Sequence, residues 1–170
     1  MEEDNIGDPV RYFLYPKSSG NRINHVYHLS ILEDYLQINL KKIKYIFEFG
    51  GGYGCMARIF YKINKNIKYS IFDTKLVNLI QYYYLKQNKM DVGFKNKNQF
   101  TLENETLKLN NEKQKQSLFL ANWSLSEAPI NYRNKFLKLI DKYDYIFIAF
   151  QEYFEEVNNR QYFNNFEKKL

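Results

Sequence analysis

The chain has 170 residues, of which 45% are hydrophobic and 18% aromatic, so it is no disordered tail and suits one domain with a sizeable core. Its formal net charge is +6, but the lysines are scattered along the sequence, and we expect no nucleic-acid partner. The single cysteine, Cys55, excludes an internal disulfide framework.

The acidic start of the chain lacks the basic-then-apolar order of a signal peptide. No apolar run approaches the roughly 20 residues that a membrane helix needs. We therefore expect a cytoplasmic protein without a membrane span. No C-x-x-C pair and no cluster of acidic residues with ligand spacing is present, so we expect no metal.

Residues 1–40 are expected to form an N-terminal arm and a helix, ahead of a larger domain over residues 41–170. Glycines and prolines in the first 20 residues predict an irregular arm. Asn21 is the predicted N-cap of a helix that runs to about Leu40. His25 and His28 are three residues apart and would share one side of this helix.

Strands and helices are predicted to alternate through the rest of the chain. The expected strands cover residues 44–49, 68–73, 117–122 and 143–150, and the expected helices cover 55–62, 75–86 and 131–142. Between residues 88 and 116 a short strand is predicted either at 90–94 or at 99–102. This alternation implies a mostly parallel sheet flanked by helices. A polar tail is predicted after Glu152.

The first of these strands ends abruptly in the glycine turn, residues 50–54, and a helix follows directly. Glycine is needed where the backbone takes a positive φ or must approach a ligand closely. The N-terminus of the helix presents free N–H groups and a partial positive charge. This combination predicts the floor of a cofactor site.

Two cofactors compete for the glycine turn. The dinucleotide fingerprint G-x-G-x-x-G/A would place its third glycine where Cys55 stands, which argues against an NAD-type oxidoreductase. The spacing Glu48-x-Gly50-x-Gly52-x-Gly54 resembles instead the first motif of the class I S-adenosylmethionine-dependent methyltransferases. Asp73 ends the next strand, where a carboxylate can accept hydrogen bonds from both ribose hydroxyls. The alternative is a simple tight turn, with Asp73 capping a helix.

A narrower resemblance rests on four segments in order, at residues 47–54, 69–73, 122–129 and 148–151. They are similar to the sugar O-methyltransferases of bacterial polysaccharide gene clusters. The resemblance implies a Rossmann-like class I methyltransferase fold, S-adenosylmethionine as cofactor, and methylation of a sugar hydroxyl on a small-molecule or glycan acceptor.

The same resemblance implies roles for individual residues. The methionine part of the cofactor is expected over Gly50, Gly51, Gly52, Tyr53 and Gly54, its ammonium group near Glu48, its ribose at Asp73, and Asn122 is expected beside it. Glu127 is the expected general base, with His28 or His25 as the alternative if the N-terminal helix covers the site. Glu127 is equally suited to capping the helix that follows Pro129, and Trp123 is expected in the core or beside the adenine.

Class I methyltransferases usually continue to a sixth and a seventh strand, which the polar tail after Glu152 does not predict. The chain is then a fragment, a truncated reading frame, or a protomer of a homo-oligomer that borrows its sheet edge from a partner. The alternative functions are therefore an impaired methyltransferase remnant that serves as a binding or oligomerisation module, and an NAD-type oxidoreductase.

Overall fold

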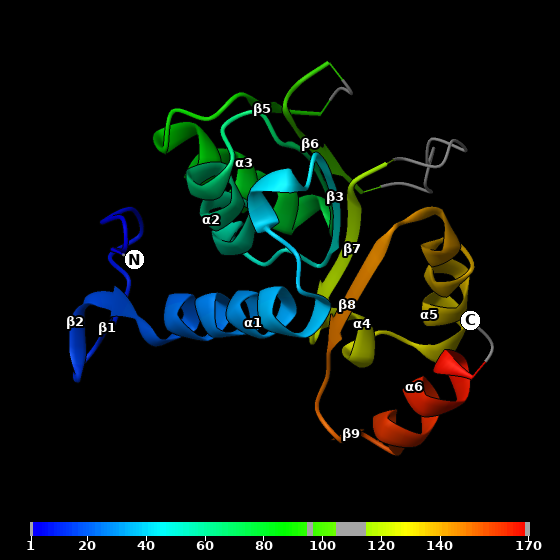
Figure 1. Cartoon of the computed structure of the whole chain (residues 1–170). Helices are drawn as coiled ribbons and strands as arrows, with labels where there is room; N and C mark the ends of the chain where they lie inside the picture. The colour runs from blue at the N-terminus through cyan, green and yellow to red at the C-terminus, as the bar shows by residue number, and fades with distance from the viewer. Residues whose placement is uncertain (1, 95–96, 105–114, 169–170) are drawn as a thin grey trace.

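The computed structural model describes residues 2–94, 97–104 and 115–168, which fold around a six-stranded, wholly parallel sheet (Figure 1). The strand order is β5-β6-β4-β3-β7-β8. The strands are β3 (Tyr45–Phe49), β4 (Lys68–Phe72), β5 (Val92–Gly93), β6 (Phe100–Glu103), β7 (Ser117–Asn122) and β8 (Tyr145–Ala149). The prediction of a mostly parallel sheet flanked by helices is confirmed.

Helices cover both faces of this sheet and create two hydrophobic cores. The first face packs against α1 (Gly20–Leu36), α2 (Cys55–Ile63) and α3 (Lys75–Gln87), and the second against α5 (Ile130–Leu137) and α6 (Asn159–Glu167). Successive side chains of β3 point to opposite faces, so Ile46 joins the first core and Phe47 the second. The short helix α4 (Ser124–Glu127) follows β7 directly.

The N-terminal helix begins earlier and ends earlier than predicted. Its N-cap is Ser19, whose hydroxyl accepts a hydrogen bond from the Arg22 backbone N–H at 3.2 Å, and the predicted N-cap Asn21 lies within the helix. Gln37 takes a left-handed conformation, with φ of 51°, and ends the helix. Leu40 instead begins the 3₁₀ helix η1 (Leu40–Lys42).

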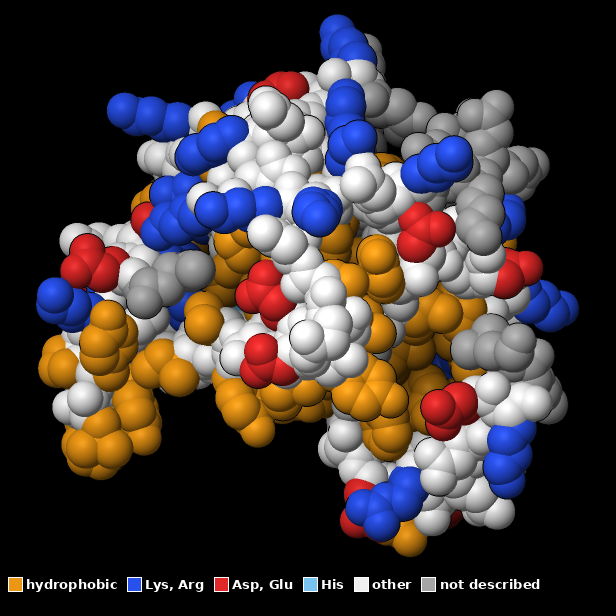
Figure 2. All heavy atoms as spheres, viewed as in Figure 1, with side chains coloured by type: hydrophobic (Ala, Val, Ile, Leu, Met, Phe, Trp, Pro, Cys, Tyr) orange, Lys and Arg blue, Asp and Glu red, His pale blue; other side chains and the backbone are white. Residues whose placement is uncertain are grey.

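The predicted irregular arm contains a small antiparallel hairpin of β1 (Arg11–Tyr12) and β2 (Tyr15–Ser19). Figure 2 shows hydrophobic side chains gathered over this hairpin, where Phe13 is 79% and Leu14 69% exposed. This hairpin was not predicted, because two hydrophobic residues occupy its turn in place of the usual Asn-Gly or Asp-Gly.

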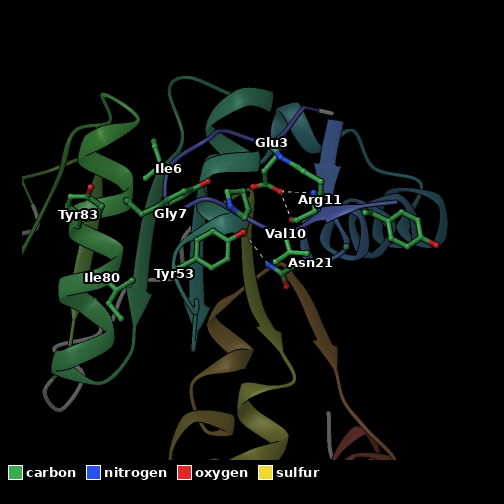
Figure 3. Close-up of a pocket in the computed structure, with 14 residues that line it drawn as sticks. Glu3, Ile6, Gly7, Val10, Arg11, Asn21, Tyr53, Ile80 and Tyr83 are labelled. Atoms are coloured by element: carbon green, nitrogen blue, oxygen red, sulfur yellow. Dashed lines mark hydrogen bonds between the residues drawn. The ribbon is translucent and has the colours of Figure 1, made fainter. Parts of the chain in front are cut away.

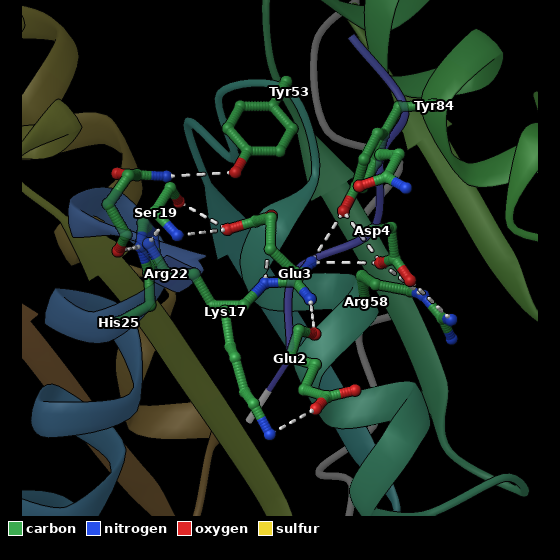
Figure 4. Close-up of polar contacts among 12 residues, drawn as sticks. Glu2, Glu3, Asp4, Lys17, Ser19, Arg22, His25, Tyr53, Arg58 and Tyr84 are labelled. Carbon is green, nitrogen blue, oxygen red and sulfur yellow. Dashed lines mark hydrogen bonds and ion pairs between the residues drawn. The ribbon is translucent and has the colours of Figure 1, made fainter. Parts of the chain in front are cut away.

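An ionic clamp, formed by Glu3, Asp4, Arg22 and Arg58, ties the acidic start of the chain to the helices (Figure 4). The side chain of Arg22 is fully buried and pairs with Glu3 and with Asp4, both at 3.1 Å. Asp4 also accepts a hydrogen bond from Arg58 of α2 at 3.2 Å. The clamp thus joins the N-terminal segment to the larger part, and the division at residue 40 stays a prediction.

Other predicted elements differ in detail. Both of the alternative strands between residues 88 and 116 form, as β5 and β6, because each pairs in parallel with a neighbour. The polar run at residues 110–116 contains no large hydrophobic residue and is predicted to form a loop, but most of it lies outside the described residues. The helix predicted over residues 131–142 divides into α5 and the 3₁₀ helix η2 (Ile140–Lys142).

The polar residues after Glu152 form regular structure and no irregular tail, while the predicted lack of a sixth and a seventh strand after the fifth is confirmed among the described residues. The hairpin of β9 (Tyr153–Phe154) and β10 (Val157–Asn158) follows β8, and α6 then packs on the second core through the buried Phe163. The ring of Phe163 lies 4.6 Å from that of Phe150, centroid to centroid. In the part of the chain that the structure describes, no strand pairs with the outer edge of β8, and no helix has the length and apolarity to cross a membrane.

Candidate functional site

The glycine turn lies between the end of β3 and the start of α2. Gly50, Gly52 and Gly54 have φ angles of 70°, 53° and 100°, in the left-handed region that residues other than glycine rarely adopt. Gly54 is the N-cap residue of α2, so the turn delivers the chain directly into the helix.

The glycines of the turn differ in what an added Cβ atom would meet. A Cβ on Gly50 would collide with the side chain of Ser124, and one on Gly51 would lie 2.7 Å from Cγ2 of Ile71. A Cβ on Gly52 would meet no atom within 4 Å. Packing therefore requires glycine at positions 50 and 51. At Gly52 the place that a Cβ atom would take is open space.

Asp73 lies beside this turn, directly after β4. Its carboxylate accepts hydrogen bonds from the Thr74 backbone N–H at 2.8 Å and from Nε2 of Gln81 at 3.0 Å. Burial raises the pKa of Asp73, while these donors and the backbone N–H groups of Gly51 and Gly52 oppose that rise. The same Gln81 amide donates to the Gly52 carbonyl at 2.8 Å, so one side chain joins the carboxylate to the turn.

Glu48 is buried on β3 directly beneath the turn. Its Oε2 accepts a hydrogen bond from the Tyr69 hydroxyl at 2.9 Å. Burial raises the pKa of Glu48 to about 8, and the charge of Asp73 adds to the rise. The carboxyl is therefore mostly protonated at neutral pH until a positive charge approaches it.

The polar cavity, of about 240 Å³, lies above the turn and beneath α1. His25 and His28 line it from α1, and Glu48 lines it from below. Asn122, the last residue of β7, and Trp123 complete the lining. The helix therefore covers the site, which was the condition under which a histidine was predicted to take part.

Three polar atoms at this cavity are buried and make no hydrogen bond of regular length and angle with the described residues, although the Asn122 amide lies close enough to His28 to oppose the fall in its pKa. They are Nδ1 of His28 and both the oxygen and the nitrogen of the Asn122 amide. A buried polar atom left in this way costs about 1–3 kcal/mol. Burial lowers the pKa of His28, so its ring is neutral at pH 7 and can accept a proton. The arrangement is suited to a ligand that supplies hydrogen bonds.

Trp123 has a φ of 64°, which is rare and strained for so large a residue. Its backbone N–H donates to the Ala149 carbonyl at 2.7 Å, and its carbonyl accepts from the Ser126 N–H at 2.8 Å. The ring stands edge-on to His28 at 6.1 Å and is 45% exposed. Of the two positions predicted for Trp123, the core is therefore wrong, and a place beside the adenine stays a prediction.

The Asp73 cavity, of about 540 Å³, lies on the other side of Gly50, which lines both cavities. Its walls include Asp73, Tyr132 and Glu127. Glu127 is exposed, and its Oε1 accepts a hydrogen bond from Nε2 of Gln151 at 3.3 Å. The two predicted bases, Glu127 and His28, thus belong to different cavities.

Most of the predicted site residues meet at the two cavities. The polar cavity takes His28, Glu48, Gly50, Gly51, Gly52, Tyr53 and Asn122, and the Asp73 cavity takes Gly50, Asp73 and Glu127. Gly54 lines neither cavity and faces Leu85. Sequence reasoning missed Gln81, although its position seven residues after the N-cap Thr74 puts both on one face of α3.

Comparison of the whole chain with known proteins gives matches in structure but not in sequence. No protein-family model matches it, and no curated protein does. The structure of coclaurine N-methyltransferase bound to N-methylheliamine and SAH matches with a TM-score of 0.54 and 14% identity, over 85% of this chain and 40% of that one. A SAM-dependent methyltransferase from Aquifex aeolicus matches with a TM-score of 0.52 and 15% identity, over 78% of this chain and 63% of that one.

A third match, assigned as a sarcosine dimethylglycine methyltransferase from Galdieria sulphuraria, has a TM-score of 0.51 and 14% identity, over 68% and 41% of the two chains. The chain thus spans 40% to 63% of the length of these three proteins. All three are methyltransferases by name, and at these identities the likeness concerns the fold. The predicted Rossmann-like methyltransferase fold is confirmed.

Proposed function

We propose that the chain binds S-adenosylmethionine across the polar cavity and the Asp73 cavity and transfers its methyl group to an acceptor. The observation that carries the proposal is the set of three buried polar atoms of His28 and Asn122 that lack a partner, above a glycine with open space at its Cβ position. The fold it shares with methyltransferases, one of them bound to SAH, supports it.

The residues fit the cofactor in parts. The amino-acid portion suits the polar cavity, where the Asn122 amide can both donate to its carboxylate and accept from its ammonium. An ammonium group near Glu48 would favour the charged form of that carboxyl. The Asp73 carboxylate suits the ribose hydroxyls as an acceptor, and the apolar walls of the Asp73 cavity suit the adenine.

When bound, S-adenosylmethionine supplies a methyl group on a sulfonium, whose C–S bond breaks with its electron pair returning to sulfur as the bond to the acceptor oxygen forms. The acceptor hydroxyl must then lose its proton. His28 is the base that we favour, because its neutral ring has Nδ1 free at the polar cavity. General-base catalysis contributes typically about 10²–10⁴-fold. Wild-type turnover in His28→Gln would contradict this assignment, and Glu127 would take its place.

The acceptor that we propose is a sugar hydroxyl in polysaccharide or glycan biosynthesis. This part rests on the resemblance of four sequence segments to sugar O-methyltransferases, including residues 122–129, which contribute Asn122 and Glu127 to the two cavities. Turnover of an amine acceptor with no methylation of any hydroxyl would contradict it.

A second candidate function is association through the outer edge of β8. All five residues of that strand are half-buried, and no described strand pairs with this edge, which leaves backbone N–H and C=O groups for another chain. A mass that rises with concentration in light scattering, with no heat on addition of cofactor, would favour this candidate over methyl transfer.

Calorimetry with S-adenosylhomocysteine tests the proposed cofactor. We expect the wild type to bind it and Asp73→Ala to bind it at least about tenfold more weakly, since a carboxylate beside the turn is lost. Asp141→Ala, at an exposed position of η2, is the matched control and should bind as the wild type does. No binding by folded wild type would contradict the proposal, and equal affinity in Asp73→Ala would exclude Asp73.

A further inference from the structure

The arm cavity, of about 640 Å³, is a third cavity and lies between the N-terminal arm and α3 (Figure 3). Ile6 and Val10 line it from the arm, Ile80 and Tyr83 from α3, and Tyr53 lies between the two sides. Cavities that hold small molecules in proteins run from about 300 to 1,000 Å³. The arm cavity is therefore large enough for a whole ligand.

The arm cavity adjoins the polar cavity. Tyr53 and Asn21 line both of them, and Nδ2 of Asn21 donates a hydrogen bond to the Tyr53 hydroxyl at 3.3 Å. Tyr53 belongs to the glycine turn itself. A molecule in the arm cavity thus lies one side-chain pair away from the cavity that contains His28.

The charged groups around the arm cavity are already engaged with the protein. The Glu3 carboxylate pairs with Arg22 and accepts from Ser19, and the Tyr84 hydroxyl accepts from Arg22 at 2.8 Å. The Arg11 guanidinium donates to the Lys17 carbonyl at 3.2 Å. Few hydrogen-bonding groups remain for a ligand, in contrast with the polar cavity.

The apolar groups around the arm cavity, by contrast, are exposed. Val10 is 88%, Tyr83 60% and Ile80 51% exposed, although all three are hydrophobic or aromatic. Neighbouring exposed apolar side chains around a cavity gain free energy when a ligand covers them. The ring of Tyr53 packs edge-on against Tyr84 at 4.9 Å, which presents a fixed aromatic surface.

The ionic clamp fixes the arm wall of this cavity before any ligand binds. Asp4, two residues before Ile6, is held by Arg22 and Arg58, and the Glu3 side chain is almost wholly buried. A wall that is already ordered reduces the entropy lost on binding.

From these observations we infer that the arm cavity binds an apolar ring group of the methyl acceptor. Resting on the proposed function, the inference narrows the acceptor class to a sugar or similar hydroxyl compound that carries an aromatic or alicyclic substituent. The substituent occupies the arm cavity, and the hydroxyl group reaches past Tyr53 and Asn21 to the polar cavity.

Calorimetry with paired glycosides tests this inference. The p-nitrophenyl and the methyl glycosides of a panel of hexoses are titrated into the full chain, with and without saturating S-adenosylhomocysteine. We expect p-nitrophenyl forms to bind at least about tenfold more tightly than their methyl partners, because only they carry a ring for the apolar walls. Ile80→Asp should abolish this preference by placing a charge in the wall.

Leu76→Asp is the matched control, since Leu76 is 71% exposed, lies one turn earlier on α3 and does not line the arm cavity. It should keep the preference. Equal binding of the two glycoside forms, no binding of any p-nitrophenyl glycoside, or a preference that survives Ile80→Asp would overturn the inference. Binding of S-adenosylhomocysteine alone tests the proposed cofactor site. A failure of the proposed function can therefore be told apart from a failure of the inference about the arm cavity.

Discussion

The polar cavity and the arm cavity share Tyr53 and Asn21, yet they differ in whether their polar groups have partners within the protein. In the polar cavity, buried atoms of His28 and Asn122 lack hydrogen-bond partners. In the arm cavity the charged side chains of Glu3 and Arg11 have partners elsewhere in the protein, and apolar side chains such as Val10 are exposed. The difference indicates that one cavity is suited to a charged or hydrogen-bonding ligand part and the other to an apolar one.

The largest expected effect concerns the ionic clamp that fixes the arm cavity. Arg22→Ala should lower the free energy of unfolding by about 3–5 kcal/mol, because it leaves the buried Glu3 carboxylate without its partner. Urea unfolding followed by circular dichroism measures the change. Arg160→Ala removes an arginine from an exposed pair with Glu152 and should cost less than about 1 kcal/mol. A similar loss of unfolding free energy in Arg22→Ala and Arg160→Ala would contradict the stabilising role of the ionic clamp.

The central strands of the sheet were predictable from the sequence, because buried runs such as residues 45–49 and 117–122 are mostly apolar and bounded by polar or glycine residues. The first residue of α1 was not, since Ser19 and Asn21 are both good N-caps and only the extended backbone of Ser19 decides between them. Helix α6 was missed because its apolar Phe163 lies among asparagines with weak helix propensity.

At the site, the glycine turn and Asp73 were predictable because motif spacing fixes them along the chain. That His28 and Asn122 line the same cavity could not be predicted, since it depends on how α1 packs over the sheet. The separation of Glu127 from His28 depends on Ser124, whose side chain packs against Gly50 between the two cavities. The strained φ of Trp123 likewise has no sequence signal.

The second prediction concerns the titration of Glu48, beneath the polar cavity. The pKa of Glu48 is about 8 in the folded chain, against an ordinary value of 4.5, through burial and the charge of Asp73, although Tyr69 opposes the rise. The unfolded chain therefore loses this proton first, and the free energy of unfolding falls as pH rises between these values. The two histidines, whose folded pKa values are lowered, add a slope of the opposite sign near their ordinary pKa of 6.5, but this slope is the same in wild type and in Glu48→Gln and cancels in the comparison.

Between pH 6.5 and 8 the wild type should therefore lose up to about 1.4 kcal/mol of unfolding free energy per pH unit relative to Glu48→Gln. Urea unfolding at several pH values measures both proteins. Glu127→Gln, the same substitution at an exposed position, should keep the wild-type slope. Parallel pH profiles for wild type and Glu48→Gln would exclude a shifted Glu48.

The third prediction compares a glycine at the polar cavity with one at the arm cavity. Gly52 and Gly7 have φ angles of 53° and 79°, and a Cβ on either would meet no protein atom within 4 Å. Both alanine variants thus bear a similar backbone strain. Gly52→Ala should weaken S-adenosylhomocysteine binding about tenfold by filling cofactor space, whereas Gly7→Ala should not. Equal affinities for the two variants would contradict the assignment of the polar cavity.

The most direct test of the central claim compares two ligands that differ only in the part assigned to the polar cavity. S-adenosylhomocysteine carries an amino-acid group, and 5′-methylthioadenosine lacks it. If the Asn122 amide receives that group, calorimetry on the wild type should give at least about tenfold tighter binding of S-adenosylhomocysteine. Equal affinity for the two ligands, or binding of neither, would contradict the account.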